Sequence, residues 1–145
     1  MKNIDIISFF RDNGEKVVTI KSYLYSFYYR FIVKHTSMKK LKKRLGKEGE
    51  ESPYEETPEN LQLANLYAFH VNRITEHLPW NAKCFVRALT LRKLLSEKNI
   101  SSTIYLGIKN SEHGLQAHAW LRCGNTFITG GYGKGYTKVA TFSNL

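Results

Sequence analysis

The spacing of apolar residues changes once along this chain of 145 residues, and that change limits the folds that it can adopt. Up to about Ser96, apolar side chains recur every three or four residues, which is the period of a helix. Beyond Asn99 the pattern becomes that of strands, with clear alternation between residues 116 and 123. We therefore expect an α+β fold in which a central helix packs against a small antiparallel sheet.

The first predicted helix covers residues 15–34. Its apolar face is formed by side chains at spacings of three and four: Val17, Ile20, Leu24, Phe27 and Phe31. The same periodicity continues through the basic residues 39–44 as far as Gly46, and the Glu-rich residues 48–56 predict a loop. We assign residues 1–58 to a helical basic arm with an acidic linker, and residues 59–145 to the domain that carries the chemistry.

Two more helices are predicted. Thr57 supplies a capping hydroxyl and Pro58 occupies the first turn, so a helix should run from there to Glu76 or His77. It should bury Leu63, Leu66, Val71 and Ile74. The next helix should cover about residues 82–96, with five residues available for the core: Phe85, Ala88, Leu89, Leu91 and Leu95.

The strands should follow residue 100. We expect strands at residues 103–108 and 116–123, separated by a turn over residues 109–115. Gly124 and Asn125 predict a tight hairpin into a strand at residues 126–129. Glycines at 130, 131 and 133 should interrupt the pairing before a short strand within residues 136–142.

The charge of the chain is unevenly distributed. The net charge is +10, and residues 1–47 alone carry twelve basic and three acidic side chains. The basic run at residues 39–44 is either a solvated helix face or a contact for an acidic leader, an acidic partner or anionic lipid. A basic module that binds nucleic acid or a membrane surface is therefore a competing interpretation of the whole protein, and it predicts salt-sensitive binding.

The two cysteines, Cys84 and Cys123, are too few and too far apart for a disulfide scaffold. The first residues become charged too early for a signal peptide, and no stretch approaches 18 apolar residues. We therefore expect a cytoplasmic protein with reduced thiols. No cysteine or histidine pair has the close spacing of a zinc site, so we predict neither a metal nor a cofactor.

The chemistry-bearing pair is Cys84 and His118. Cys84 lies in the first turn of a predicted helix, where unpaired backbone amides favour a thiolate. His118 lies on an alternating strand and shares a face with Trp120 and Arg122. If that face lies against the start of the helix, the imidazole can act as the base and then the acid for a cysteine nucleophile. Cys123 points with the core residues of the strand and is expected to pack there.

The residues around this pair resemble a known family. The motifs are Pro79 and Trp80, then Cys84, Arg87, Ala88, Leu91, Leu94 and Leu95, then Tyr105 to Ile108, and finally Ala117, His118, Ala119, Trp120, Gly124 and Gly130. Together they resemble the transglutaminase-like peptidase domain of lasso-peptide biosynthesis proteins, the leader-peptidase half of the split B protein. The resemblance covers residues 60–142 and implies a transglutaminase-like, papain-like cysteine peptidase core.

The resemblance also implies a substrate and partners. The substrate is a ribosomally made precursor peptide whose leader is removed, and a separate ATP-dependent cyclase then closes the macrolactam. A separate leader-recognition protein presents the leader, whose extended chain could add an edge strand, and no nucleic acid takes part. A transglutaminase-like acyltransferase shares the same site, and a non-catalytic relative is a further alternative.

The resemblance assigns Cys84 as the nucleophile and His118 as the base. The family's third residue is usually an Asp after the His, but no Asp occurs after Asp12 in this chain. The remaining candidates that could orient the imidazole are Glu112, Asn125 and a backbone carbonyl near Gly130. The candidates for the oxyanion hole and for substrate contact are the amide of Cys84, Trp80, Asn81 and Trp120.

Overall fold

A computed structural model describes residues 14–77, 84–112 and 114–144 of the chain. The N-terminal part forms helices α2 (Gly14–His35) and α3 (Met38–Lys42) and the short strand β1 (Lys47–Glu48). Helices α4 (Pro58–Glu76) and α5 (Cys84–Ser96) follow. Four strands complete the described chain: β2 (Thr103–Ser111), β3 (Gly114–Cys123), β4 (Thr126–Thr129) and β5 (Thr137–Ser143).

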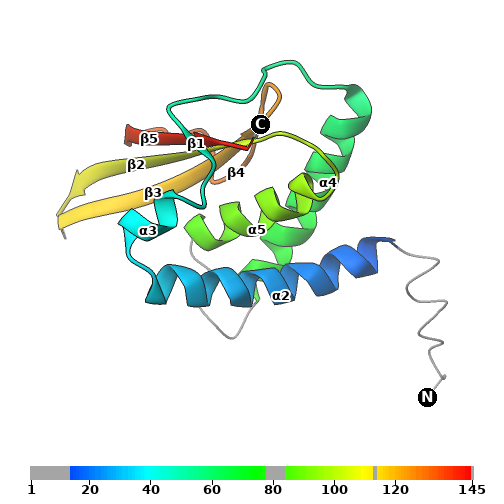
Figure 1. Ribbon diagram of the computed structural model, residues 1–145, viewed down its shortest axis with the longest axis horizontal. Helices are drawn as coiled ribbons and strands as arrows, with labels where there is room; N and C mark the ends of the chain where they lie inside the picture. Colours follow the sequence, from blue (N-terminus) through cyan, green and yellow to red (C-terminus); the bar gives the residue numbers. More distant parts are fainter. Residues whose placement is uncertain (1–13, 78–83, 113, 145) are drawn as a thin grey trace.

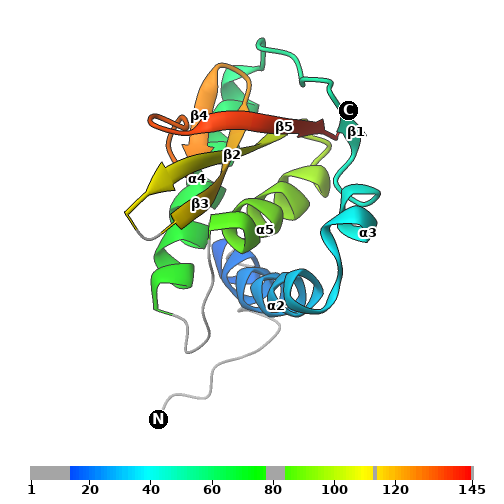
Figure 2. The ribbon, with the colours of Figure 1, turned by 90° about the vertical axis from the view of Figure 1, so that its left-hand side faces the viewer.

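The strands form one antiparallel sheet with the order β1-β5-β2-β3-β4. Helices α2, α4 and α5 lie on one side of this sheet, and α5 lies between the sheet and α2 (Figures 1 and 2). The predicted α+β architecture is therefore confirmed. No helix in the described residues is long and apolar enough to cross a membrane.

Helix α5 forms the centre of the hydrophobic core. Its contacts reach α2, α4 and β3. The largest apolar residues of this core are shielded almost completely from solvent: Leu45, Leu91, Leu95, Ile100, Ile104, Leu121 and Phe142. Because α5 is covered on both sides, its buried residues are not confined to one stripe, and even Thr90 is fully buried, where its hydroxyl donates to the Val86 carbonyl.

Helix α4 begins at the capping residues that predicted its start. The Thr57 hydroxyl accepts a hydrogen bond from the Asn60 amide at 3.2 Å, and Pro58 occupies the first turn. The prediction that Leu66 is buried is wrong, because its side chain remains 36% exposed. Tyr67 and Ala68 are buried on this helix instead.

The apolar face of α2 does not pack against the core. Leu24, Phe27 and Phe31 are all more than half exposed, whereas Ser22 and Ser26 are fully buried. The two serine hydroxyls donate to carbonyl oxygens of α2 itself, so burial leaves neither donor unpaired. Small side chains let α2 pack closely on its neighbours, which an apolar period alone does not reveal.

The hairpin between β2 and β3 is longer than predicted. The two strands pair from Thr103 and Arg122 to Ser111 and Gly114. The expected turn over residues 109–115 is therefore mostly strand. Apart from Gly114 and Leu115 its residues are polar, and those that the structure describes are partly or fully exposed, so they lack the buried apolar alternation that marks a strand in sequence.

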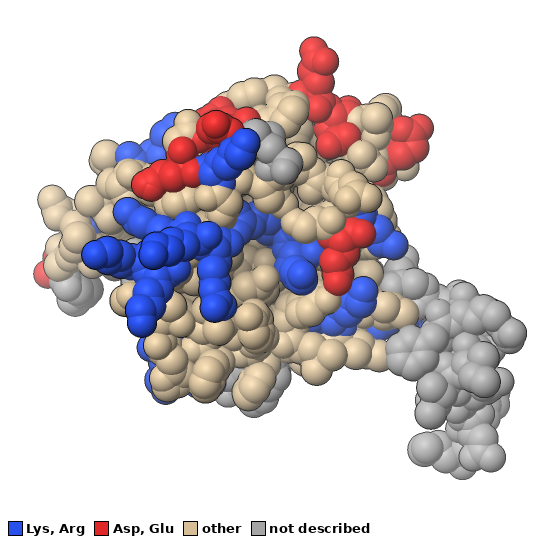
Figure 3. Space-filling view, viewed as in Figure 1, with Lys and Arg blue, Asp and Glu red and all other residues tan. Residues whose placement is uncertain are grey.

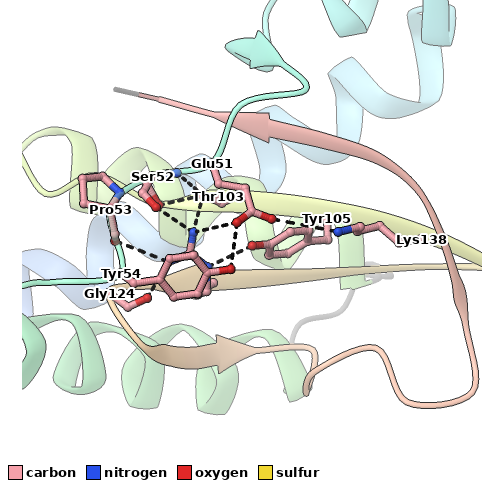
Figure 4. Close-up of polar contacts among 9 residues, drawn as sticks. Glu51, Ser52, Pro53, Tyr54, Thr103, Tyr105, Gly124 and Lys138 are labelled. Atoms are coloured by element: carbon pink, nitrogen blue, oxygen red, sulfur yellow. Dashed lines mark hydrogen bonds and ion pairs between the residues drawn. The ribbon is translucent and has the colours of Figure 1, made fainter.

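A buried arginine fastens the linker between β1 and α4 to the sheet (Figure 4). Arg122 is 1% exposed, and its guanidinium donates to the Ser52 carbonyl at 2.7 Å and to the Tyr105 hydroxyl at 2.9 Å. It also donates to the carbonyls of Pro53 and Gly124. The Tyr54 ring covers the guanidinium at 3.8 Å from its centroid. A planar group with five donors satisfies this set of acceptors, which a lysine could not.

Replacing Arg122 should destabilise the protein because it leaves several carbonyl oxygens buried without donors. We expect Arg122→Met to lower the free energy of unfolding by about 3 kcal/mol. Lys138→Met is the control, since the Lys138 side chain is half exposed and lies 3.9 Å from Glu51, and its loss should cost less than about 1 kcal/mol. Urea unfolding measures both values, and equal effects of the two substitutions would contradict a structural role for Arg122.

Candidate active site

Cys84 is the first residue of α5, and its sulfur contacts the sheet. The backbone N–H of Ala119 on β3 donates a hydrogen bond to Sγ of Cys84, with 3.3 Å between the nitrogen and the sulfur. Ala119 directly follows His118 in the chain. The structure therefore places the Cys84 sulfur against the residue that follows His118 on β3. The Cys84 side chain is only partly buried, so it is accessible to a substrate.

The pairing of β3 explains why Ala119 can donate to the thiol. β2 pairs with β3 along most of its length, but β4 pairs only with Leu121, Arg122 and Cys123. In antiparallel sheets, successive residues turn their backbone N–H and C=O groups alternately to one neighbour and then to the other. The Ala119 N–H points away from β2, at a position that β4 does not reach, and the Cys84 sulfur accepts it instead.

The imidazole of His118 is held by a backbone carbonyl. Its Nε2 lies 2.6 Å from the carbonyl oxygen of Gly130. A carbonyl oxygen only accepts, so Nε2 must carry the proton of this hydrogen bond. In the neutral ring, Nδ1 then has a free lone pair and can take a proton. The backbone carbonyl near Gly130, one of the three predicted orienting groups, is therefore the group that lies in place.

Aromatic rings hold the imidazole on the side of the sheet away from the helices. The ring of His118 stacks with Tyr136 at 4.9 Å and with Trp120 at 5.9 Å between centroids. Trp120 in turn stacks on Tyr105 at 5.7 Å and is only 4% exposed. This packing restricts the ring of His118 to one orientation. Tyr105 and Tyr136 are parts of the site that were not predicted from the sequence.

Glycines make room for these groups. A Cβ atom on Gly130 would lie 2.4 Å from the Ala119 carbonyl oxygen, and the φ angle of +77° at Gly130 also favours glycine. On β2, a Cβ atom on Gly107 would lie 2.8 Å from the Trp120 ring, which occupies the space above this residue. The glycines after β4 therefore determine the shape of the site around His118. The cluster of glycines at positions 130, 131 and 133 is the sequence feature from which a crowded site could have been predicted.

The other predicted site residues lie elsewhere or are not described. Glu112 lies in the turn between β2 and β3, and Asn125 lies in the turn between β3 and β4, so the two are at opposite ends of the strand that carries His118. The Asn125 side chain accepts a hydrogen bond from the Thr126 hydroxyl. Trp80 and Asn81 lie outside the described residues. Trp120 forms a buried wall beside the imidazole.

The two faces of β3 differ from the arrangement considered from sequence. The face that packs with α5 in the core is that of Ala119, Leu121 and Cys123, not that of His118. The Cys84 sulfur contacts the backbone amide of Ala119, the residue after His118, at the edge of the strand. Cys123 is fully buried, and this burial raises the pKa of its thiol to about 11, which makes it a packing residue. Among the described residues, no cluster of His, Cys, Asp and Glu could hold a metal ion.

Comparison with protein families agrees with this geometry. A family model described as the transglutaminase-like superfamily matches residues 28–141, which include Cys84, His118 and Gly130. The chain belongs to the transglutaminase-like superfamily. Comparisons with curated proteins and with solved structures found no match. Membership of the superfamily agrees with a site of the cysteine-peptidase or acyltransferase type.

A methyl group at Gly130 should destabilise the protein more than a methyl group at Gly131. We expect Gly130→Ala to lower the free energy of unfolding by about 1 kcal/mol more than Gly131→Ala does. Both glycines have a positive φ, of +77° and +72°, but a Cβ atom on Gly131 meets nothing within 4 Å. The difference between the two variants therefore isolates the contact with Ala119. Equal urea unfolding curves for the two variants would contradict the close approach.

Proposed function

We propose that this protein is a cysteine peptidase that removes the leader from a ribosomally synthesised lasso-peptide precursor, before a separate cyclase closes the macrolactam. The observation that carries the proposal is the contact of the Cys84 sulfur with the residue after His118, while the Gly130 carbonyl orients the imidazole. Membership of the transglutaminase-like superfamily supports the reaction type. The resemblance of the motifs around Cys84 and His118 supports the choice of substrate.

The proposed reaction has two steps. Nδ1 of His118 takes the proton of the Cys84 thiol, and the sulfur attacks the carbonyl carbon of the bond between leader and core. The bond to the core nitrogen breaks, the imidazolium gives its proton to that nitrogen, and the leader remains bound to Cys84 as a thioester. His118 then takes a proton from a water molecule, whose oxygen displaces the sulfur. One water molecule is consumed, and the free thiol returns.

The orienting group affects the expected rate more than the reaction type. The Gly130 carbonyl keeps the proton on Nε2 and fixes the ring, as the third residue of a catalytic triad does. A carbonyl has only a dipole with which to stabilise the imidazolium, whereas a carboxylate has a full charge. We therefore propose that the enzyme works without an acidic third residue. The amide of Cys84 with a donor from Trp80 or Asn81 is the proposed oxyanion hole.

The edge of β3 offers a place for the leader. Residues 114–117 are exposed, and among the described strands only β2 pairs with them. Leu115 and Ala117 turn their backbone groups to the same side as Ala119, because they are separated from it by even numbers of residues. An extended leader paired with this edge would run directly to the Cys84 sulfur. The exposed side chain of Leu115 offers it an apolar contact.

The proposal includes partners and a location. A separate leader-recognition protein would bring the precursor to this edge, and the freed N-terminus of the core would pass to the ATP-dependent cyclase. All of these act in the cytoplasm, where thiols stay reduced, as the single free thiol of the site requires.

Mass spectrometry of the reaction products tests the proposed function. The precursor encoded beside this protein is incubated with the chain and its leader-recognition partner. We expect two fragments whose masses sum to the precursor plus one water. Cys84→Ala and His118→Ala should each lower the rate by at least about a thousandfold. His77→Ala is the matched control, because His77 is exposed at the end of α4 and should leave the rate unchanged.

Other outcomes would point to the competing functions. A leader joined to an added primary amine, in place of the hydrolysed product, would identify an acyltransferase that uses the same thioester. An intact precursor in every reaction, with wild-type protein that is folded and bound to its partner, would contradict catalysis and favour a binding role.

A further inference from the structure

Helix α2 exposes an apolar surface that the core does not use. Five of its large side chains are between 41% and 63% exposed: Tyr23, Leu24, Phe27, Tyr28 and Phe31. Exposed apolar groups that are scattered singly are normal, but five on one helix form a continuous patch. We name this patch the α2 aromatic surface.

The α2 aromatic surface is separate from the candidate active site. The helix packs inward through its serine face, so its apolar face points away from α5 and from the sheet. In both ribbon views α2 forms the layer farthest from the strands, with α5 in between (Figures 1 and 2). Within the described residues, neither the core nor the chemistry of Cys84 and His118 therefore accounts for the exposure of Tyr23, Leu24, Tyr28 and Phe31.

Positive charge adjoins this surface. Residues 16–47 contain ten Lys and Arg side chains and no Asp or Glu. Four exposed lysines belong to α3 or directly follow it: Lys39, Lys40, Lys42 and Lys43. Figure 3 shows Lys and Arg gathered over α3, beside the uncharged surface over the C-terminal half of α2. Arg30 and Lys34 add cations on α2 itself.

We propose that α2 and α3 together bind the surface of an anionic membrane. Phe, Tyr and Leu side chains on the outside of one helix can enter the boundary between lipid headgroups and acyl chains, while lysines attract the lipid phosphates. The two contributions add, and this stretch of the chain has no carboxylate that anionic lipid would repel. The helix would lie in the plane of the interface, because no described helix is apolar enough to span a membrane.

The shape and charge of the α2 aromatic surface favour a lipid bilayer over a protein groove as its binding partner. A protein partner must match the shape of its site, whereas a bilayer accepts any ridge of apolar side chains with cations beside it. Docking through α2 would also leave the sheet on the far side of α5 from the membrane (Figure 2). The open edge of β3 and the Cys84 thiol would then stay accessible to a precursor peptide in solution.

Co-sedimentation of the full chain with lipid vesicles tests this proposal. One set of vesicles contains equal parts of phosphatidylcholine and phosphatidylglycerol, and the other contains phosphatidylcholine alone. We expect binding to the anionic vesicles that weakens as salt is raised, and at least about tenfold weaker binding to the neutral ones. Circular dichroism verifies that each variant is folded.

Two groups of variants separate the apolar and charged contributions. Leu24→Ser with Phe31→Ser should weaken binding to anionic vesicles at least about tenfold, and so should Lys39→Gln, Lys40→Gln, Lys42→Gln and Lys43→Gln together. Val139→Ser is the matched control, because Val139 is 57% exposed on β5, away from α2, and should change nothing.

Several results would overturn the proposal. The first is absence of binding to anionic vesicles, and the second is binding that neither group of variants weakens. The third is a dimer, or a complex with the leader-recognition protein, that forms in wild type and is lost in the Leu24 and Phe31 variant while lipid binding stays unchanged. The peptidase proposal does not depend on the result, because precursor cleavage is assayed without lipid.

Discussion

The site depends on the backbone of one residue, Ala119. Its N–H holds the Cys84 sulfur, and its carbonyl oxygen is approached so closely by Gly130 that only glycine is accommodated there. The carbonyl of Gly130 then fixes the imidazole of His118. The side chains of Cys84 on α5 and His118 on β3 are thus each positioned by a hydrogen bond to a backbone group.

Strand β3 is fixed in the fold because side chains on both of its faces are buried. Leu121 and Cys123 are buried in the core beneath the sheet, and Trp120 and Arg122 are buried on the opposite side. Arg122 ties the linker before α4 to the sheet, while Trp120 supports the ring of His118. Because β4 is short, residues 114–117 of β3 pair only with β2 among the described strands. The same strand therefore provides rigidity, the proposed base and the proposed place for an extended peptide.

Local chemistry made much of this predictable. The cap at Thr57 and the glycine hairpin at Gly124 follow from residue types with specific conformational roles. The chemistry of Cys84 and His118 also singled out these two residues, and the Cys84 sulfur lies against the residue after His118. The orienting carbonyl could only be placed near Gly130, because every residue has a carbonyl and only the fold decides which one faces the ring. The orientation of α2 was also hidden, since periodicity shows that an apolar face exists but not whether the core or an external surface covers it. The aromatic packing around His118 required the register of β2 and β3, which sequence spacing does not give.

The central claim is that Cys84 forms a covalent bond to the leader with help from His118. Rapid acid quenching of the enzyme with its precursor, followed by intact-protein mass spectrometry and peptide mapping, tests it most directly. The account predicts a mass increase equal to the leader acyl group, located on Cys84 and absent from Cys84→Ala and His118→Ala. Cleavage of the precursor that proceeds in Cys84→Ala, with no adduct on the wild-type enzyme at any time, would contradict it.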